Sequence, residues 1–225
     1  MQAVIFDLDG TMIDSMPTHK KSWGLLMAEY QLSVDLDDFM KVTTGKTGRE
    51  CMRTLFNSGL SDGEADFFIE KKEHLYRELF RTSFQEIQGF KTFLDLLINA
   101  GVFVAIGTAT NRDNVVFSLD ELGLSQDVFH SIVCGVDVTK GKPEPDIFLE
   151  ASRRMGVRPE NCLVFEDSLY GIEAAMRANM KAVAITSTHA EQDFLSWPHV
   201  IKVVPDYSTT TPEELRSLLI RRYLT

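Results

Sequence analysis

The sequence has few cysteines, no excess of positive charge and no long apolar run. Its cysteines are Cys51, Cys134 and Cys162, and their odd number and wide spacing argue against a disulfide framework and against a CxxC metal or redox site. We expect all three to be small buried apolar side chains. The formal net charge of −10 argues against binding of nucleic acid or anionic membranes, so a phosphate-bearing ligand would need a local positive site.

No run of about 18 apolar residues is present, and the N-terminus lacks the basic segment and apolar stretch of a signal peptide. We therefore expect a cytoplasmic protein. Hydrophobic residues make up 44% of the 225 residues and charged residues 25%, which is typical of a protein that folds unaided. The length allows one large domain or two smaller ones.

Short β-branched runs that are apolar at consecutive positions indicate strands buried on both faces of a sheet. The predicted strands cover residues 3–9, 102–108, 131–135, 162–167, 182–186 and 200–204. Predicted helices lie at residues 91–100, 113–122, 145–155, 171–179, 190–196 and 212–222. The alternation of strand and helix predicts an α/β fold with a doubly wound, mostly parallel, Rossmann-like sheet.

Residues 15–83 interrupt this alternation. They contain amphipathic helical stretches at residues 18–32, 35–43, 49–59 and 62–80, with no convincing strand. We interpret residues 15–83 as an inserted, all-helical cap domain, and we assign residues 1–14 and 84–225 to the α/β core domain. Ligands of such sheets lie beyond the carboxyl ends of the strands, so these ends are where chemistry is expected.

The first predicted strand ends in two carboxylates. Asp7 and Asp9 would point to the same side of an extended strand, and carboxylates held that close repel each other unless a cation or a shared proton intervenes. An EF-hand does not explain them, because the sixth and twelfth positions counted from Asp7 are Met12 and Thr18 rather than glycine and glutamate.

Polar residues also stand at the ends of later strands. They are Thr108, Lys142, Glu166 and Asp167. Acidic residues from two strands make an oxygen-rich site suited to Mg²⁺. A lysine and a hydroxyl beside it can hold a phosphate whose charge the metal also offsets. The sequence therefore predicts a phosphoryl-transfer site.

The order of these motifs, DxDGT after a strand, then a threonine, then KP, then ED, resembles the haloacid dehalogenase superfamily. The cap position and the forms KPEPDIF and EDSLYGIEAA resemble its β-phosphoglucomutase-like branch. The resemblance implies that Asp7 is a nucleophile that forms an aspartyl phosphate. It implies that Asp9 is the general acid and base, with its backbone carbonyl offered to Mg²⁺.

The same resemblance assigns roles to the later motifs. Asp167 would be a magnesium ligand together with Asp7, and Glu166 a ligand or a residue that supports one. The residues that would bind the transferring phosphoryl group are Thr108, Ala109 and Lys142. A carboxylate that attacks a phosphate dianion meets like-charge repulsion, so the lysine and the metal are both needed.

In the cap, residues 43–50 (TTGKTGRE) resemble the substrate-specificity loop of that branch. Lys46 or Arg49 is able to contact a second phosphate or a sugar there, against the alternative of a solvated helix start. The string GKT is not a nucleotide P-loop, because Met40 stands where that motif needs glycine. His19 matches a histidine of the branch and would contact substrate; the alternative is a histidine on a helix surface.

We expect a Mg²⁺-dependent phosphatase of a small phosphorylated metabolite, such as a sugar phosphate, in a monomer or weak homodimer. Thr11 and the order GKTG resemble phosphatases more than β-phosphoglucomutase, which must keep its aspartyl phosphate from water. The mutase remains an alternative, as do inorganic pyrophosphatase and a non-catalytic phospho-aspartate switch. A switch module is shorter and carries its aspartate on a later strand.

Overall fold

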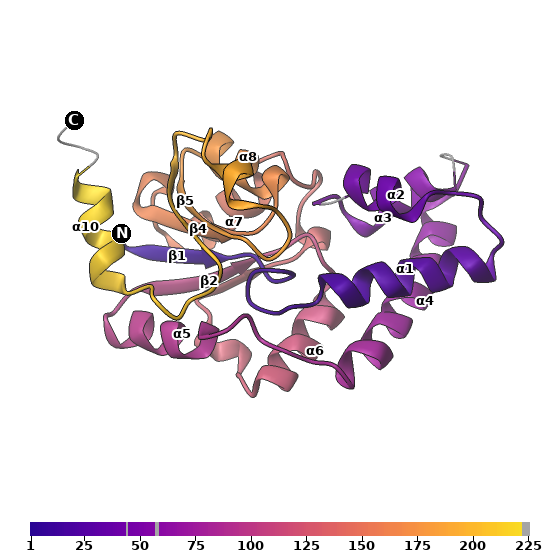
Figure 1. Cartoon of the computed structure of the whole chain (residues 1–225), viewed down its shortest axis with the longest axis horizontal. Helices are drawn as coiled ribbons and strands as arrows, with labels where there is room; N and C mark the ends of the chain where they lie inside the picture. Colours follow the sequence, from indigo (N-terminus) through magenta and orange to yellow (C-terminus); the bar gives the residue numbers. More distant parts are fainter. Residues whose placement is uncertain (44, 57–58, 222–225) are drawn as a thin grey trace.

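The computed structural model describes residues 1–43, 45–56 and 59–221, which form an α/β core and a helical cap (Figure 1). The core contains a six-stranded sheet in the order β3-β2-β1-β4-β5-β6, and all its pairings are parallel. The strands are β1 (Ala3–Phe6), β2 (Phe103–Gly107), β3 (Ser131–Val133), β4 (Cys162–Glu166), β5 (Lys181–Ile185) and β6 (Val200–Val204).

Strand β1 lies inside the sheet because all of its residues are apolar and pack on both faces. Its Ile5 pairs with Ala105 of β2 and with Val164 of β4. Strands are added outward from β1 in one direction and from β4 in the other. The carboxyl ends of β1 and β4 are therefore the switch point at which doubly wound sheets bind ligands.

Helices cover both faces of the sheet (Figure 1). Val4 and Phe6 pack with α5, α6 and α10, whereas Ala3 and Ile5 pack with α7, α8 and α9. These helices are α5 (Phe90–Asn99), α6 (Arg112–Leu122), α7 (Asp146–Met155), α8 (Leu169–Arg177), α9 (Glu191–Phe194) and α10 (Pro212–Arg221). Short 3-10 helices cover Gln126–Val128, Gly135–Asp137 and Pro159–Asn161.

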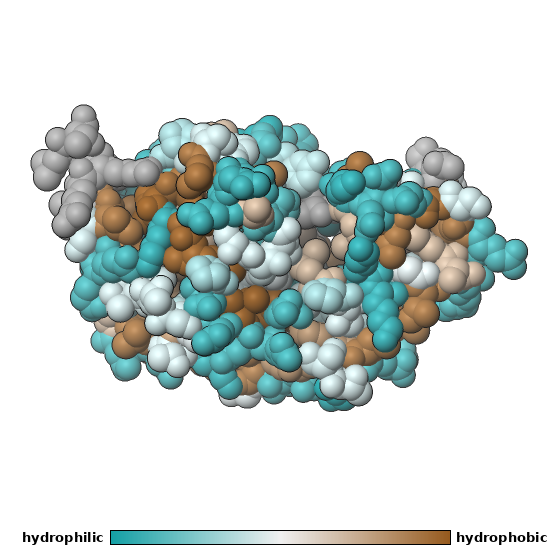
Figure 2. All heavy atoms as spheres, viewed as in Figure 1, coloured by the Kyte–Doolittle hydropathy of each residue, from teal (hydrophilic) through white to brown (hydrophobic). Residues whose placement is uncertain are grey.

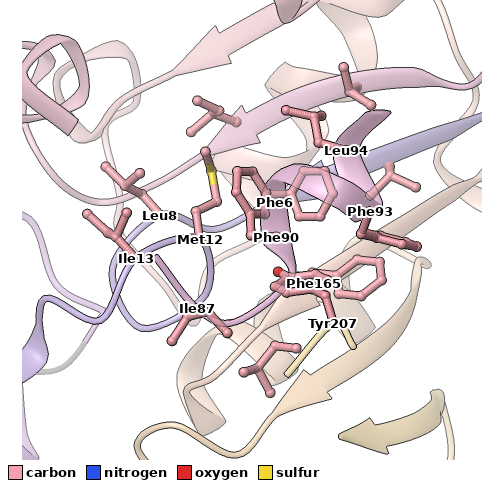
Figure 3. Packing of buried hydrophobic residues seen from close by; sticks show 14 of the residues in the cluster. Phe6, Leu8, Met12, Ile13, Ile87, Phe90, Phe93, Leu94, Phe165 and Tyr207 are labelled. Atoms are coloured by element: carbon pink, nitrogen blue, oxygen red, sulfur yellow. The ribbon is translucent and has the colours of Figure 1, made fainter. Parts of the chain in front are cut away.

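Aromatic side chains fill the core beneath α5 (Figure 3). The rings of Phe6 and Phe90 meet edge to face at 5.3 Å, and Tyr207 stacks on Phe165 at 5.4 Å. The Tyr207 hydroxyl also donates a hydrogen bond to the backbone carbonyl of Thr11 at 3.1 Å. This bond fastens the segment that follows β1 to the rigid core.

The cap contains α1 (Met16–Glu29), α2 (Leu36–Thr43), α3 (Gly48–Leu55) and α4 (Asp62–Arg81). These helices enclose a small apolar core of their own around Trp23, Phe39 and Met52. A capping box between Thr47 and Glu50 starts α3, where each residue satisfies a backbone amide of the other. Within the described part of the chain, no helix combines the length and the apolar character that a bilayer crossing requires.

The predicted fold class is confirmed, and each predicted core element matches an observed one closely in sequence. Several boundaries differ, most of all that of the first strand, which ends at Phe6 rather than Asp9 because the backbone turns and the amide of Met12 donates to the carbonyl of Leu8 at 2.9 Å. The helix predicted at 190–196 is limited to Glu191–Phe194. Parts of the predicted segments 43–50, 49–59 and 212–222 fall at residues 44, 57–58 and 222, outside the described residues.

Candidate active site

Three carboxylates meet at the carboxyl edge of the sheet. Asp7 follows β1, Glu166 ends β4 and Asp167 follows β4. All three side chains are buried, and one oxygen of each lies within 4.8 Å of the others. The structure thus brings together the acidic residues that the sequence placed at the ends of these two strands.

Lys142 reaches this cluster from the segment before α7. Its Nζ lies 2.5 Å from Oδ1 of Asp7 and also contacts the carboxylate of Glu166. Burial acts to lower the pKa of Lys142, but the charges of Asp7 and Glu166 outweigh it, and the pKa is raised. Lys142 therefore stays protonated and places a positive charge beside Asp7. Without it, a phosphate at this site would meet only negative charge.

Two glycines make room for the carboxylates. A Cβ at Gly10 would lie 2.3 Å from Oδ2 of Asp167, and a Cβ at Gly171 would lie 1.8 Å from Oε1 of Glu166. Gly10 also has a φ of +81°, which residues with side chains disfavour. At the start of α8 the amide of Ser168 donates to Glu166 at 2.6 Å. These backbone features fix the positions of both carboxylates.

The cluster carries more negative charge than Lys142 offsets. Burial raises the pKa of Asp7 to about 8, although Lys142 opposes this shift. The pKa of Asp167 is also raised, by burial and by the charges of Glu166 and Asp7. A cation that joins these groups would stabilise their ionised forms, and carboxylate oxygens are the donors that Mg²⁺ and Ca²⁺ prefer. The donor set therefore fits a hard divalent cation.

Asp9 lies next to the cluster, but its side chain contacts the cap. Its Oδ1 accepts hydrogen bonds from Oγ of Ser15 at 2.7 Å and from Nε2 of His19 at 3.1 Å. Burial would raise the pKa of Asp9, but the interaction with His19 and the hydrogen bond from Ser15 prevail, and the pKa is lowered. Asp9 is thus an ionised carboxylate held in a fixed orientation.

His19 joins Asp9 to helix α4. Its ring stacks on Tyr76, with 3.8 Å between centroids, and its Nδ1 lies 2.7 Å from Nζ of Lys72. Because an ammonium group only donates hydrogen bonds, Nδ1 accepts and Nε2 carries the proton that is donated to Asp9. Both ring nitrogens are therefore used inside the protein. The substrate contact expected of His19 stays a prediction, and this geometry favours a role in positioning Asp9.

A cavity of about 760 Å³ lies between core and cap. Figure 2 shows hydrophilic residues beside the indentation between these two parts. Every site residue predicted from the sequence lines the cavity: Asp7, Asp9, His19, Lys46, Arg49, Thr108, Ala109, Lys142, Glu166 and Asp167. Its size is typical of sites for small molecules.

At the cap end of the cavity, Arg49 is held by carboxylates. Its Nε and Nη2 donate to the two oxygens of Asp66 at 2.7 and 2.6 Å, and its Nη1 lies 3.4 Å from Asp62. Arg53 also pairs with Asp62. Lys46 lines the cavity and forms no ion pair with any residue in the described ranges. Of the two loop residues predicted to contact substrate, Arg49 therefore forms ion pairs within the protein and Lys46 forms none with the described residues.

Sequence reasoning missed Lys72 and Thr188. Thr188 donates to Oδ2 of Asp167 at 2.6 Å, and nothing in its loop signals this contact. Lys72 lies among charged residues, where exposure is the rule, yet it is only 2% exposed. Helical spacing gives one available signal, because Lys72 shares a face of α4 with the buried Ala65 and Tyr76.

Comparisons with known proteins identify the family of this chain. A family model described as haloacid dehalogenase-like hydrolase matches residues 4–185. Fructose-1-phosphate phosphatase YqaB of Escherichia coli (strain K12) is 30% identical over 184 residues, which cover 81% of this chain and 95% of that protein. The range of the family model includes Asp7, Lys142 and Asp167 as well as helices α1 to α4.

Solved structures share the fold. A HAD hydrolase, family IA, variant 3, from Entamoeba histolytica HM-1:IMSS superposes with a TM-score of 0.85 at 28% identity, covering 98% of this chain and 100% of that chain. A β-phosphoglucomutase from Clostridium difficile gives a TM-score of 0.85 at 23% identity, with 100% of both chains covered. The chain belongs to the haloacid dehalogenase-like hydrolase family, with the fold of its β-phosphoglucomutase-like branch, and is an enzyme of the phosphatase type.

Proposed function

We propose that the chain is a Mg²⁺-dependent phosphatase of a small phosphorylated metabolite that acts through an aspartyl phosphate on Asp7. The observation that carries the proposal is the contact of the buried Lys142 with Asp7, at 2.5 Å, beside two further carboxylates. A carboxylate attacks a phosphate dianion only where positive charge offsets their repulsion. Asp7 has such a charge beside it and lines the cavity.

The proposed ligands of Mg²⁺ are the side chains of Asp7 and Asp167 and the backbone carbonyl of Asp9. Carboxylate and carbonyl oxygens suit this ion. When bound, Mg²⁺ supplies positive charge that offsets the charge of the phosphate and of the transition state. Glu166, which contacts both Lys142 and the Ser168 amide, is suited to orienting the lysine and supporting the other ligands.

In the first proposed step, a carboxylate oxygen of Asp7 bonds to phosphorus while the bond from phosphorus to the ester oxygen breaks. Lys142 and Thr108 hold the phosphoryl oxygens, and Asp9 gives a proton to the leaving oxygen. Because its pKa is lowered, Asp9 is ionised before substrate enters. A phosphate dianion beside it raises that pKa again, which favours uptake of the proton it must donate.

In the second proposed step, water attacks the phosphorus of the aspartyl phosphate. Asp9, again ionised, takes a proton from this water, and the bond between phosphorus and Asp7 breaks to release inorganic phosphate. The hydrogen bond from Nε2 of His19 holds Asp9 in one orientation for both proton transfers. The cycle leaves Asp7 as a free carboxylate.

The proposal divides the chain into a core domain, residues 1–14 and 84–225, and a cap domain, residues 15–83, that selects the substrate. The activity named for the Escherichia coli relative supports a sugar phosphate, and a cavity of about 760 Å³ has room for one. Lys46 has no ion-pair partner in the described ranges, so we assign it a hydrogen bond to a substrate oxygen.

The nucleophile is tested with Asp7→Asn, which keeps the shape of the side chain and removes its charge. We expect phosphate release from p-nitrophenyl phosphate with Mg²⁺ to fall to background, and EDTA to abolish the activity of the unmodified enzyme. Asp14→Asn is the matched control, because Asp14 is exposed and should turn over normally. Normal turnover by Asp7→Asn would remove Asp7 from the mechanism.

β-Phosphoglucomutase is the second candidate, favoured by a shared fold with a TM-score of 0.85. The two activities are separated by supplying β-glucose 1-phosphate, Mg²⁺ and a trace of glucose 1,6-bisphosphate, and then measuring both products. Inorganic phosphate is expected from a phosphatase. Glucose 6-phosphate without inorganic phosphate would show that water is kept from the aspartyl phosphate, and the enzyme would then be a mutase.

A further inference from the structure

The cap end of the cavity carries as much negative as positive charge. The charged cap residues that line it, within the described ranges, are Lys46, Arg49, Arg53, Lys72, Glu50, Asp62, Asp66 and Glu73. Four of these are cations and four are anions, so this end has no net charge. At the core end, Lys142 and the proposed metal provide the positive charge. Under the proposed function, Lys142 and the metal bind the transferred phosphate at the core end, and the cap end supplies no net positive charge for a second phosphate.

Among the cap residues that line the cavity, Arg49 has the side chain best suited to binding a phosphate. Its guanidinium group is already hydrogen-bonded to Asp66. Nε and Nη2 of Arg49 donate to both oxygens of Asp66, at 2.7 and 2.6 Å. This two-point contact is the geometry in which arginine binds phosphate. A second phosphate on the substrate would therefore need the same edge of the guanidinium group.

Opening the pair would not make the cap end attractive to a second phosphate. Arg49 and Asp66 are 48% and 50% exposed, and ion pairs with that exposure open readily. The carboxylates of Asp66 and Asp62 would then remain beside the incoming phosphate and repel it. Because Asp62 also pairs with Arg53, the two arginines and two aspartates together stay neutral.

We propose that Asp66 is a specificity-determining residue that masks Arg49, so that the enzyme accepts monophosphates of uncharged, hydroxylated compounds and discriminates against bisphosphates. The inference rests on the proposed function for the position of the transferring phosphate. Carboxylate oxygens in the pair keep lone pairs that accept hydrogen bonds from substrate hydroxyls. Trp23, Met16 and Ile69 line the same cavity and offer apolar contact to a carbon skeleton. Sugar and polyol monophosphates have this combination of groups.

The test measures binding in an Asp7→Asn background, so that the ligands are not consumed. Calorimetry with Mg²⁺ gives the dissociation constants of fructose 1-phosphate and fructose 1,6-bisphosphate. In the background protein, the bisphosphate should bind no more tightly than the monophosphate. Addition of Asp66→Asn frees Arg49 and should improve binding of the bisphosphate relative to the monophosphate by about tenfold.

Three further variants serve as controls. Asp37→Asn makes the same change at an exposed cap residue that pairs with Lys20 outside the cavity, and should leave the ratio of dissociation constants unchanged. Arg49→Gln added to Asp66→Asn should remove the gain. Asp62→Asn should give a smaller gain in the same direction, which provides a second test if Asp66→Asn folds poorly.

Several outcomes would overturn the inference. These are a ratio that neither Asp66→Asn nor Asp62→Asn changes, a gain that survives Arg49→Gln, and tighter binding of the bisphosphate by the background protein. Because calorimetry measures no turnover, a negative result here leaves the rate test on Asp7 intact. A failure of that rate test is recognised by release of inorganic phosphate from Asp7→Asn, which a changed binding ratio does not cause, so the two failures are distinguishable.

Discussion

The two ends of the cavity use charged side chains in opposite ways. At the core end, Asp7, Glu166 and Asp167 are buried with Lys142, and their charges do not balance. At the cap end, Arg49 and Asp66 form a balanced pair that is about half exposed. Charges act strongly where water is excluded and are screened where it is present. Under the proposed function, the chemistry takes place where the charges are buried, and substrate selection takes place where charged partners are exposed and can exchange.

After the loss of Asp7 itself, the largest effect is expected from Lys142→Met, which removes the buried positive charge. We expect kcat/KM for p-nitrophenyl phosphate to fall by about 10³-fold, because phosphate would meet Asp7 without its neighbouring cation. Lys140→Met changes the same residue type at an exposed position and should retain normal activity. Equal activity of the two variants would contradict the distinction between the buried core end and the solvated surface.

A smaller loss is expected from Gly171→Ala, because the new Cβ would lie 1.8 Å from Glu166 and force that carboxylate away from Lys142. We expect kcat/KM to fall by about 10- to 100-fold, as is usual when support of a metal site is disturbed. Gly63→Ala is the matched change in the cap, where a Cβ meets nothing within 4 Å. It should raise stability by about 0.5 kcal/mol, measured by urea unfolding.

Because the carboxylates at the core end outnumber its cations, the stabilisation of the protein by Mg²⁺ should depend on pH. In the metal-free protein the pKa of Asp7 is raised from 3.8 to about 8, so the folded state keeps a proton that the unfolded state loses. Stability without metal should therefore fall as pH rises from about 4 to about 8. Because Mg²⁺ needs the ionised carboxylate, its stabilising effect should grow over the same range.

Thermal unfolding with and without Mg²⁺ at pH 6 and pH 8 checks this expectation. The increase in Tm on adding Mg²⁺ should be larger at pH 8 than at pH 6. In Asp7→Asn the difference between the two pH values should shrink, because the titrating group is gone. Equal increases in the unmodified protein at both pH values would show that burial does not govern ionisation of Asp7.

The smallest effect is expected from Arg53→Gln, which breaks an exposed ion pair with Asp62 at the cap end. We expect Tm to change by less than about 2 °C, because exposed ion pairs contribute little to stability. Differential scanning calorimetry of the variant and the unmodified protein measures the change. A large drop in Tm would mean that the ion pairs at the cap end contribute strongly to stability, which would contradict the contrast with the buried core end.

Much of the fold follows from local patterns in the sequence. The apolar run at 162–167 predicts β4, and the order of strands and helices predicts the parallel sheet and the edge at which its polar residues gather. The exact ends of helices and strands depend on individual hydrogen bonds, such as those of capping side chains. Helix α8 begins at Leu169 rather than at Gly171, because the side chain of Ser168 accepts a hydrogen bond from the Gly171 amide and caps the helix.

The sequence did not predict which side chains of different cap helices contact each other. Lys72 reaches His19 across 53 residues, and Asp66 reaches Arg49 across 17 residues. Helical spacing indicates at most that Lys72 is buried, and the local pattern does not indicate which residues these charged side chains contact. Only the packing of α1 and α3 against α4 decides which charges meet. For this reason the sequence predicts the residues of the core motifs but not the pairing at the cap end.

The most direct measurement of the central claim is chemical trapping of the phosphorylated enzyme. Rapid mixing with substrate and Mg²⁺, acid quenching and reduction with borohydride convert an aspartyl phosphate to homoserine, which mass spectrometry locates in the sequence. The account predicts homoserine at position 7 and no such conversion in Asp7→Asn. Homoserine at another aspartate, or phosphate release during turnover with no modified residue at any time, would contradict it.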